Sequence, residues 1–384
     1  MNKTILIASD SYKSSLDSSG VNNAIESGLK KVFPNYEYVK VSVADGGEGT
    51  IQSLIENVGG DIITHQVHGA MGELEDGQYG IINNEIAILE TASPLGLHRL
   101  NRNNLNPNMA SSYGLGEMII HAMDNGMKEL YIGLGGSSTN DGGFGMARAL
   151  GAKFYDKDGN EIYQSVKELI NLDYIDLSNL NPKISSTKFI LLSDVNNPLC
   201  GKTGATYVYG PQKGVKTDEL DEFDNSIMQF GKVLETTFNK SIINEVSAGA
   251  AGGLGGGLMA FCDAKVESGI DKFLELSDFD TFLKSADFVI TGEGQMDYQS
   301  AFGKAPVGIA KFAKKFNIPV FAIVGSTGVG IEQVYDHGID LIFDIVNRPM
   351  TLDESINNAY SQIQLASIHC AQAIKLINDK TANN

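Results

Sequence analysis

Loops rich in glycine, serine and aspartate recur along this chain, and several of them come directly after runs of apolar residues. One such loop indicates no more than a turn, because glycine is a common turn former. Repeated at the ends of strands, these loops would let backbone N–H groups approach an anion closely. They read DSYKSS at Asp10, ADGGEGT at Ala44, GLGGSSTNDGG at Gly133, SDVNNP at Ser193, GPQKG at Gly210, SAGAAGGLGGG at Ser247, TGEGQMD at Thr291, GKAP at Gly303 and VGSTG at Val324.

The segment GLGGSSTNDGG is the best candidate for an anion-binding site. Its glycines allow close approach of the backbone, and its hydroxyl and amide side chains add hydrogen-bond donors. A helix expected to begin near Phe144 would add unpaired N–H groups and the positive end of a helix dipole. The residues that we assign to binding here are Gly135, Gly136, Ser137, Ser138, Thr139, Asn140 and Asp141.

Charged residues in these loops are more informative than the glycines. Lys13 follows a predicted strand, and the carboxylates Asp45, Asp194, Glu293 and Asp297 stand in loops predicted to face one crevice. Phosphoryl transfer from ATP requires Mg²⁺ held by one or two carboxylates, a carboxylate near the acceptor hydroxyl, and nearby cations. The chain contains these residue types, although each aspartate alone is equally well explained as a cap of a helix or turn.

Several other nucleotide and metal signatures are missing from the sequence. No GxG pair completes a dinucleotide fingerprint, and the protein-kinase motifs HRD and DFG do not occur. Gly201-Lys202-Thr203 follows a predicted strand, but Asn196 stands where a P-loop needs glycine. His65 and His68 would face opposite sides of a strand, which disfavours a shared metal ion.

Composition restricts the partners and the compartment. The net charge of −18 disfavours nucleic acid and anionic membranes as partners. No apolar run approaches the roughly 20 residues of a membrane-spanning helix, and the N-terminus does not read as a signal peptide. Three widely spaced cysteines predict neither disulfides nor a zinc site, and they fit a reducing, cytoplasmic setting. The sequence leaves the oligomeric state open, a homodimer included.

The elements that position these loops alternate between strand and helix at both ends of the chain. Strands are expected at residues 4–10, 39–43, 288–291, 319–324 and 339–346, and helices at 21–32, 51–58, 305–316, 331–337 and 352–377. This alternation predicts an α/β fold with a doubly wound parallel sheet covered on both faces. The middle of the chain is less regular and predicts an inserted mixed α/β domain. We place the first, discontinuous domain at residues 1–62 with 288–384 and the inserted domain at 63–287.

The loops, taken in order, resemble the bacterial type of glycerate kinase (the type-1 glycerate kinase family) over nearly the whole chain. The resemblance implies two α/β domains, one flavodoxin-like and built from both chain ends, the other inserted and with a mixed sheet. It also implies an enzyme that uses ATP and Mg²⁺ to phosphorylate D-glycerate, with 2-phosphoglycerate favoured over 3-phosphoglycerate as the product. The matching stretches are DSYKSS, VADGGEGT, ETASPLGL, SSYGLGE, GGSSTNDGG, DVNNPLCG, GPQKG, GAAGGLGGG and TGEGQMDYQSAFGKAP.

On this resemblance we expect in-line phosphoryl transfer in a cleft between the domains. Lys13 would meet the glycerate carboxylate, and the ATP phosphates would lie against GGSSTNDGG. Asp45, Asp194 and Asp297 would divide Mg²⁺ binding and hydroxyl positioning between them, with Asp194 favoured near the hydroxyl and Asp194 and Asp297 as candidate Mg²⁺ ligands. The other residues expected to bind substrate or nucleotide are Asp10, Ser14, Gly46, Gly47, Glu48, Lys213, Gly252, Gly253, Glu293 and Lys304.

Two positions depart from the family pattern. Ser14 stands where the pattern PDSFKGS has glycine, and Gln295 stands where TGEGR has arginine, so Lys304 or Lys213 would have to supply that charge. Two other functions remain open on this basis. One is a kinase for another small hydroxy acid or sugar. The other is a non-catalytic, ligand-binding regulatory relative, which the retained loop carboxylates disfavour.

Overall fold

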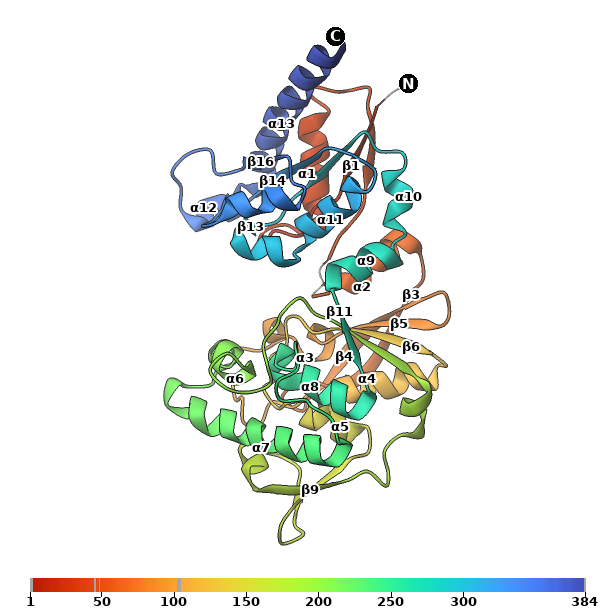
Figure 1. The fold of residues 1–384 in the computed structure, drawn as a ribbon, viewed down its shortest axis with the longest axis vertical. Coiled ribbons are helices and arrows are strands. Elements are labelled where there is room, and N and C mark those ends of the chain that lie inside the picture. The colour runs from red at the N-terminus through yellow and green to blue at the C-terminus, as the bar shows by residue number, and fades with distance from the viewer. Residues whose placement is uncertain (1–2, 45, 48, 102–104, 383–384) are drawn as a thin grey trace. The chain divides into compact units, whose positions relative to one another are not determined.

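The chain folds into two compact units, which are described separately (Figure 1). The computed structural model describes residues 3–44, 46–47, 49–101 and 105–382. Unit 1 comprises Met1–Asp45, Glu56–Val58 and Ile270–Asn384, and unit 2 comprises Gly46–Ile55 and Gly59–Gly269. Unit 1 therefore draws on both ends of the chain, and it includes residues 270–287, which the sequence pattern assigns to the inserted domain.

Unit 1 is built from short strands that alternate with helices. Its strands are β1 (Thr4–Ile7), β2 (Glu37–Lys40), β12 (Phe288–Thr291), β13 (Gln295–Met296), β14 (Val320–Val324), β15 (Ser326–Thr327) and β16 (Leu341–Asp344). Its helices and 3₁₀ turns are α1 (Ser18–Leu29), α9 (Gly269–Leu276), α10 (Phe279–Leu283), η7 (Tyr298–Phe302), α11 (Ala305–Lys314), η8 (Ile331–His337), α12 (Leu352–Asn357) and α13 (Ala359–Ala382).

The main sheet of unit 1 has five parallel strands in the order β16-β14-β12-β1-β2. Counted along the chain within the unit, this is the flavodoxin-like order 2-1-3-4-5. The direction of strand addition reverses between β1 and β12, and ligands of such sheets bind beyond the carboxyl ends of strands at this switch point. The predicted doubly wound parallel sheet is confirmed.

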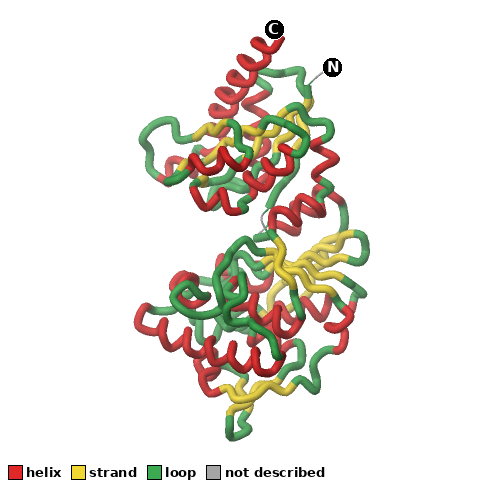
Figure 2. The backbone as a smooth tube through the Cα atoms, in the orientation of Figure 1, coloured by secondary structure: helices red, strands yellow, loops and turns green. Residues whose placement is uncertain are grey.

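Helices cover both faces of this sheet (Figure 2). Ile5, Ile7 and Ile290 pack in one core with residues of α1 and α13, and the residues between them point to the opposite face, against which α11 packs. Helices α1 and α13 lie side by side although they come from opposite ends of the chain. A Cβ at Gly28 would lie 2.3 Å from the carbonyl oxygen of Gln364, so glycine permits this close helix contact.

Unit 2 contains a mixed sheet of six strands in the order β11-β10-β6-β5-β4-β3. Its members are β3 (Asp61–His68), β4 (Leu74–Ile82), β5 (Ile86–Glu90), β6 (Glu129–Gly133), β10 (Lys188–Leu192) and β11 (Lys265–Glu267). The strands β5, β6, β10 and β11 run parallel, whereas β3 and β4 are antiparallel. The carboxyl ends of the four parallel strands therefore meet at one edge of the sheet.

The remaining elements of unit 2 surround this sheet. They are the strands β7 (Lys153–Asp156), β8 (Glu161–Ile162) and β9 (Leu172–Asp176), the helices α2 (Thr50–Val58), α3 (Ala92–Leu95), α4 (Tyr113–Asp124), α5 (Phe144–Ala149), α6 (Ala205–Tyr209), α7 (Leu220–Phe238) and α8 (Ala250–Cys262), and the 3₁₀ turns η1 (Leu97–Arg99), η3 (Val166–Asn171), η4 (Pro182–Ser186), η5 (Pro211–Lys213) and η6 (Thr217–Glu219). The rings of Phe144, Phe154 and Phe230 contact one another and join α5, β7 and α7 in one core. This core fixes α5 and hence the end of the loop that precedes it.

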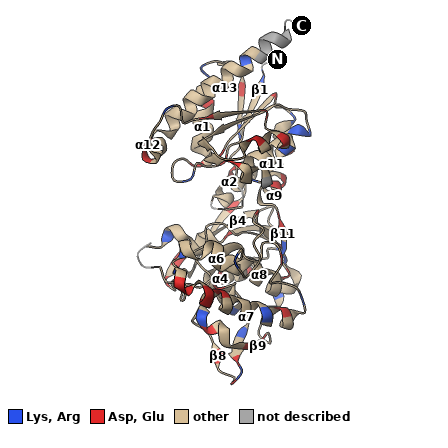
Figure 3. Cartoon of the chain, turned by 60° about the vertical axis from the view of Figure 1, so that its left-hand side comes forward, with Lys and Arg blue, Asp and Glu red and all other residues tan. Residues whose placement is uncertain are grey.

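Acidic residues occupy the first turns of exposed helices, where they favourably oppose the positive end of the dipole. In Figure 3 the ribbon of α12 carries red at its acidic residues, and its first turn contains Asp353 and Glu354. Thr351 and Glu354 form a reciprocal capping box there, which confirms the predicted helix start.

Two parts of the secondary structure differ from the sequence prediction. The glycine-rich segment predicted as a loop forms α8, with left-handed φ angles at Ala251, Gly252 and Gly253 that mark a kink. The single helix predicted over residues 352–377 is divided into α12 and α13, because Asn358 leaves helical geometry with φ −107° and ψ 9°. Glycine content and apolar spacing give no signal for either feature, since tertiary packing decides both.

Candidate active site

In unit 1, the loops after β1 and β12 lie together at the switch point of the parallel sheet. The backbone N–H of Asp10 donates to the carbonyl oxygen of Gly292 at 2.9 Å, which joins the two loops. The Asp10 carboxylate accepts from the N–H of Ser11 at 2.7 Å. The predicted binding residues Asp10, Lys13 and Glu293 are thus carried by neighbouring loops.

Glu293 is a buried carboxylate, with 6% of its surface exposed. Its Oε1 accepts from the Ser300 hydroxyl at 2.6 Å, and its Oε2 lies 3.1 Å from the Lys304 ammonium. Burial raises the pKa of the Glu293 carboxyl above its usual range, and the bonds from Ser300 and Lys304 oppose this shift. The Lys304 side chain remains 37% exposed, so its ammonium is both paired and open to solvent.

Asp297 caps the turn η7. Its carboxylate accepts from the N–H of Gln299 at 2.9 Å, and its own N–H donates to the Ser300 hydroxyl at 3.1 Å. This is a reciprocal capping box. Part of the hydrogen-bonding capacity of Asp297 therefore serves the backbone, and the same Ser300 links Asp297 to Glu293.

Lys13 stands on the exposed part of the loop after β1. Its ammonium forms no ion pair or hydrogen bond with any residue in the described part of the chain. The neighbouring Ser14 has φ 65°, in the left-handed region that glycine adopts at little cost. The loop thus keeps a backbone conformation suited to glycine although serine occupies the position.

In unit 2, the loops after β5, β6 and β10 gather at the carboxyl edge of the mixed sheet. Gly46 and Gly47 lie against this edge, because a Cβ at Gly133 would lie 2.1 Å from the carbonyl oxygen of Gly46 and one at Gly135 would lie 2.8 Å from the Cα of Gly47. Glycine permits these backbone contacts, which bring two of the predicted binding loops together.

The loop between β6 and α5, residues 134–143, is here named the serine-rich loop. Its carbonyl groups are held by donors from the protein. Gly135 accepts from the Thr91 hydroxyl at 2.8 Å, Gly136 from the N–H of Leu97 at 2.9 Å, and Thr139 from the ammonium of Lys213 at 2.7 Å.

The N–H of each of these held peptides points away from the donor, because N–H and C=O are antiparallel in a trans peptide. These N–H groups belong to Gly136, Ser137 and Asn140, and no described residue accepts from them. The side-chain atoms Thr139 Oγ1 and Asn140 Oδ1 are also buried without a partner among the described residues. Asn140 is fully buried, whereas Gly136 is exposed, so the serine-rich loop presents unpaired backbone donors at its Gly136–Ser137 end. Oriented backbone donors of this kind bind anions.

Asp141 has a different part from the one predicted. It is buried, and its carboxylate accepts from the N–H and hydroxyl of Ser112, each at 2.8 Å, and from the N–H groups of Gly143 at 3.1 Å and Gly145 at 3.0 Å. The first donors of α5 are thereby occupied. The expectation that the start of this helix offers unpaired N–H groups is wrong, because Asp141 caps it, and the unpaired donors lie in the loop itself.

Lys213 is buried beneath the serine-rich loop, with 2% of its surface exposed. Its ammonium donates to the Ser137 hydroxyl at 2.9 Å and to the Thr139 carbonyl oxygen at 2.7 Å. Burial lowers the pKa of Lys213 to about 7, and the charge of Asp141 only partly opposes this shift.

Gly252 and Gly253 lie at the kink of α8, behind the same loop. A Cβ at Gly252 would lie 2.0 Å from the carbonyl oxygen of Thr139, and one at Gly253 would lie 2.9 Å from the Cα of Gly142. The N–H of Gly142 donates to the carbonyl oxygen of Gly252 at 3.0 Å. These buried glycines therefore support the loop by allowing close backbone contact.

Asp194 follows β10 at the same edge of the sheet. In this sheet β10 is the neighbour of β6, the strand that precedes the serine-rich loop. Its Oδ1 accepts from the N–H of Gly269 at 3.1 Å, and its side chain is half-buried. The predicted residues Asp45 and Glu48 lie outside the described residues. Within the described part of the chain, no group of three or more His, Cys, Asp or Glu side chains could hold a metal ion.

Comparison with known proteins decides the family. The model described as "Glycerate kinase family" matches residues 5–375. This chain belongs to the glycerate kinase family. The resemblance seen in the sequence is confirmed, and so is the expected architecture of two α/β parts.

Several members of the glycerate kinase family are similar over their whole length. A glycerate kinase of Halalkalibacterium halodurans is 42% identical over 96% of this chain and 97% of its own. A glycerate 2-kinase of Escherichia coli K12 is 40% identical over 97% of this chain and 98% of its own. The crystal structure of a protein described as a candidate glycerate kinase 2 from Salmonella typhimurium LT2 has a TM-score of 0.84 and 36% identity, covering 99% of this chain and all of that one.

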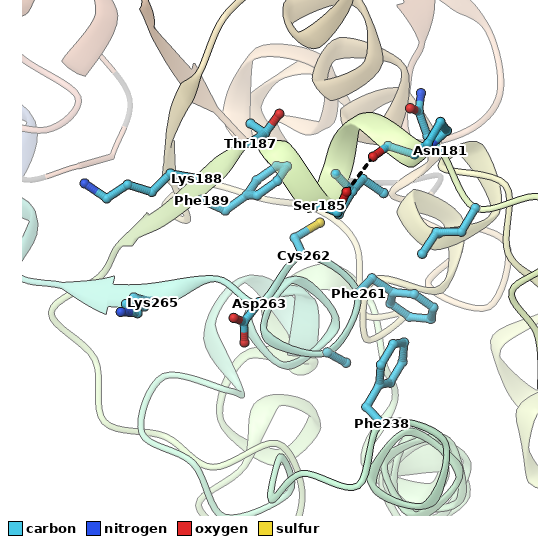
Figure 4. Close-up of a pocket in the computed structure, with 14 residues that line it drawn as sticks. Asn181, Ser185, Thr187, Lys188, Phe189, Phe238, Phe261, Cys262, Asp263 and Lys265 are labelled. Carbon is cyan, nitrogen blue, oxygen red and sulfur yellow. Dashed lines mark hydrogen bonds between the residues drawn. The ribbon is translucent and has the colours of Figure 1, made fainter.

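A cavity of about 590 Å³ lies elsewhere in unit 2 (Figure 4). It opens at the amino ends of β10 and β11, beside Lys188 and Lys265, with the Phe238 and Phe261 rings along its wall. The family motifs follow the opposite, carboxyl ends of these strands, and no predicted site residue lines the cavity. In the described part of the chain no helix is long and apolar enough to cross a membrane.

Sequence reasoning missed several residues that organise the site. Thr91 holds Gly135, Ser112 binds Asp141, and Ser300 joins Glu293 to Asp297. The signal was present, since Thr91, Ser112 and Ser300 all stand in stretches shared with the glycerate kinase family. Their roles depend on contacts between distant segments, which spacing along the chain does not reveal.

Proposed function

We propose that this protein transfers the γ-phosphoryl group of ATP to D-glycerate and that the product is 2-phosphoglycerate. Membership of the glycerate kinase family and full-length relatives that bear this name support the reaction. The relative named glycerate 2-kinase, 40% identical to this chain, supports the 2-position. The buried, unpaired cysteines support a reducing, cytoplasmic setting.

The observation that carries this proposal is the set of unpaired N–H groups in the serine-rich loop. Backbone donors fixed before a ligand arrives stabilise phosphate charge without reorganisation during the reaction. We therefore assign the phosphate groups to the N–H groups of Gly136 and Ser137, whose peptide carbonyls are held in place by Thr91 and Leu97.

Unit 1 offers cations for the second anionic substrate. We assign the glycerate carboxylate to Lys13, because its exposed ammonium has no partner among the described residues and would gain a charge-assisted bond. Lys304 provides the positive charge that the family pattern has at position 295, where this chain has Gln295. The Lys304 ammonium lies 3.1 Å from the Glu293 carboxylate. Asp10 and Ser14 shape the loop that carries Lys13.

Mg²⁺ is the proposed cofactor, and the residues present fit it. The ion usually binds through one or two carboxylates and the substrate phosphates, so it needs no cluster of protein ligands. Asp194 provides a half-buried carboxylate at the edge of the sheet that carries the serine-rich loop, and Asp297 provides one at the switch point of unit 1. When bound, Mg²⁺ neutralises phosphate charge.

Asp194 is also our choice for the residue that orients the acceptor hydroxyl and receives its proton. A carboxylate in this position is the general base expected for phosphoryl transfer to an alcohol. The hydrogen bond from Gly269 fixes one carboxylate oxygen, which limits rotation of the side chain.

The test is to incubate the protein with ATP, Mg²⁺ and D-glycerate and to identify the product by phosphorus NMR. A signal of 2-phosphoglycerate is expected, and 3-phosphoglycerate would correct the position of transfer. A panel of other hydroxy acids and sugars, followed by ADP release, is the companion experiment. Faster turnover with another acceptor would reassign the substrate. Absence of turnover with every acceptor would refute the proposal that this protein is a kinase.

A further inference from the structure

Lys213 has no exposed path to a ligand, yet it touches the loop that we assign to phosphate. Its ammonium is buried and donates to Ser137 Oγ and to the Thr139 carbonyl oxygen. A direct contact with phosphate would require these bonds to break. Burial of an ammonium group is unfavourable unless other groups compensate it, so its retention beneath this loop calls for an explanation.

The charge of Lys213 is incompletely compensated within the protein. Asp141 is the charged group that acts on it from the serine-rich loop, but the Asp141 carboxylate is already bound by Ser112, Gly143 and Gly145. Helix α6, which packs against η5, carries no acidic or basic side chain, and its titratable groups are Tyr207 and Tyr209. The described surroundings of Lys213 therefore lack an anion in direct contact.

The exposed end of the loop offers a place for the missing anion. Lys213 donates to the Ser137 hydroxyl, and the backbone N–H groups of Gly136 and Ser137 have no acceptor among the described residues. Gly136 is exposed, whereas Thr139 and Asn140 are fully buried. The ammonium of Lys213 places a positive charge near these donors, and an anion bound to them would in turn favour the charged form of Lys213.

We propose that Lys213 is a positioning residue whose ammonium forms the internal countercharge of the serine-rich loop, and that a phosphate-bearing ligand bound to the loop causes Lys213 to take up a proton from solvent. The inference rests on the proposed function, because it takes the loop as the phosphate site. The phosphate belongs either to the nucleotide or to the phosphoglycerate, and both have the same chemistry at the loop. Burial, which lowers the pKa of the free enzyme's Lys213 to about 7, is consistent with this uptake.

The experiment measures protons taken up on binding, without turnover. Mg-ADP and 2-phosphoglycerate are titrated separately at saturating concentrations, with calorimetry in buffers of different ionisation enthalpy. At about pH 8.5, where both ligands are fully ionised, uptake approaching about one proton per site is expected, because the bound state restores a lysine pKa near its usual value. At about pH 6, where the ligand phosphate also titrates, the part of the uptake that depends on Lys213 should fall towards zero, since Lys213 is already charged. The ligand that shows the uptake is the one that occupies the loop.

Three variants make the result specific to Lys213. Lys213→Met should abolish the uptake and weaken binding, whereas Lys213→Arg, which is always charged, should abolish the uptake even where binding persists. Lys216→Met is the matched control, because Lys216 is an exposed lysine on the same segment, and it should retain both uptake and activity.

Equal uptake in wild type and Lys213→Met, or no uptake in wild type with either ligand, would overturn the inference. A wild-type enzyme that phosphorylates glycerate but shows this result would refute the role of Lys213 alone. A protein that binds Mg-ADP with uptake and phosphorylates no acceptor would refute the proposed function alone.

Discussion

The surroundings of Glu293 disfavour the ionised form of its carboxyl group. Its carboxylate is buried, and burial is the largest influence on its pKa, which is raised from the usual value of 4.5. Such a group costs stability when ionised, and groups of this kind are concentrated at functional sites. The Ser300 hydroxyl and the Lys304 ammonium donate hydrogen bonds to this carboxylate and oppose the shift of its pKa.

The substitution Glu293→Gln should lower activity without lowering stability. A raised folded-state pKa means that the carboxyl contributes stability below its unfolded pKa of 4.5 and loses it as the pH rises through the folded value. The variant's stability relative to wild type should therefore increase from about pH 4.5 towards neutrality. The turnover number should fall roughly tenfold, because Lys304 loses a charge-assisted partner.

Urea unfolding at several pH values and steady-state kinetics measure the two effects. The matched control is Glu332→Gln, which removes an acidic residue from the first turn of η8 and should change neither turnover nor the pH dependence of unfolding. Glu293→Gln with wild-type turnover would remove Glu293 from the site.

Asp194 supplies the sharpest test of the proposed chemistry. Asp194→Asn preserves the side-chain shape and the bond from the Gly269 N–H but removes the base. The turnover number should fall by roughly 10²- to 10⁴-fold, the usual contribution of general base catalysis. The KM for Mg-ATP should rise as well if Asp194 holds the Mg²⁺ of the nucleotide, and it should change little if the serine-rich loop alone holds the phosphates.

Steady-state kinetics with each substrate varied in turn would measure the effect. The exposed Asp218 provides a control, since Asp218→Asn makes the same chemical change in η6. Unaltered turnover in Asp194→Asn would end the assignment of Asp194 to the hydroxyl.

At the scale of helices and loops, the kink of α8 packs against the serine-rich loop and supports its backbone. The carbonyl oxygen of Thr139 is approached from one side by Lys213 and lies close to Gly252, which has φ 72°. The position of the whole loop depends on this backbone contact, so a displacement of Thr139 by a few tenths of an ångström would also shift the unpaired N–H groups of Gly136 and Ser137.

Gly252→Ala should therefore impair folding and activity together. Its Cβ would lie 2.0 Å from the Thr139 oxygen in a left-handed conformation, and strain with overpacking should cost about 2–4 kcal/mol. Gly256→Ala is the matched control in the same helix. Its Cβ would first meet side-chain atoms 3.2 Å away, and its unfolding free energy should change by about 1 kcal/mol or less.

Urea unfolding and the KM for ATP measure both variants. Equal stability of Gly252→Ala and Gly256→Ala would show that the loop can move to accommodate the extra carbon atom, and the proposed support from α8 would then fail.

The alternation of strands and helices in unit 1 could be predicted because most strands are short apolar runs and most helices have apolar residues on one face. The exception is β2, for which the sequence predicts residues 39–43 and which lies at Glu37–Lys40. The carboxyl-end loops followed from the same pattern, including those with Lys13 and Glu293. The sequence could not predict that Asp141 caps α5 or that Lys213 is buried, because both depend on long-range contacts with Ser112 and Ser137. The sequence also could not predict α8. Glycine has the lowest helix propensity after proline, and only tertiary packing makes this glycine-rich segment helical.

The chain carries a net charge of −18, with 47 acidic and 29 basic residues, yet its proposed substrates are anions. The overall field should repel glycerate at a distance, whereas Lys13 and the oriented N–H groups act only at short range. Raising the ionic strength from about 0.01 to about 0.15 M shortens the Debye length from about 30 to about 8 Å, so it should screen the repulsion more than the contacts.

We therefore expect kcat/KM for D-glycerate, at saturating Mg-ATP, to rise roughly two- to fivefold over this range and then to decline as salt competes with the contacts. The turnover number should change less, since it reports the bound state. Replacing potassium chloride by choline chloride separates screening from a specific effect of potassium, because screening depends only on ionic strength. A steady fall of kcat/KM from the lowest salt concentration would show that local cations, and not the net charge of the chain, govern the approach of glycerate.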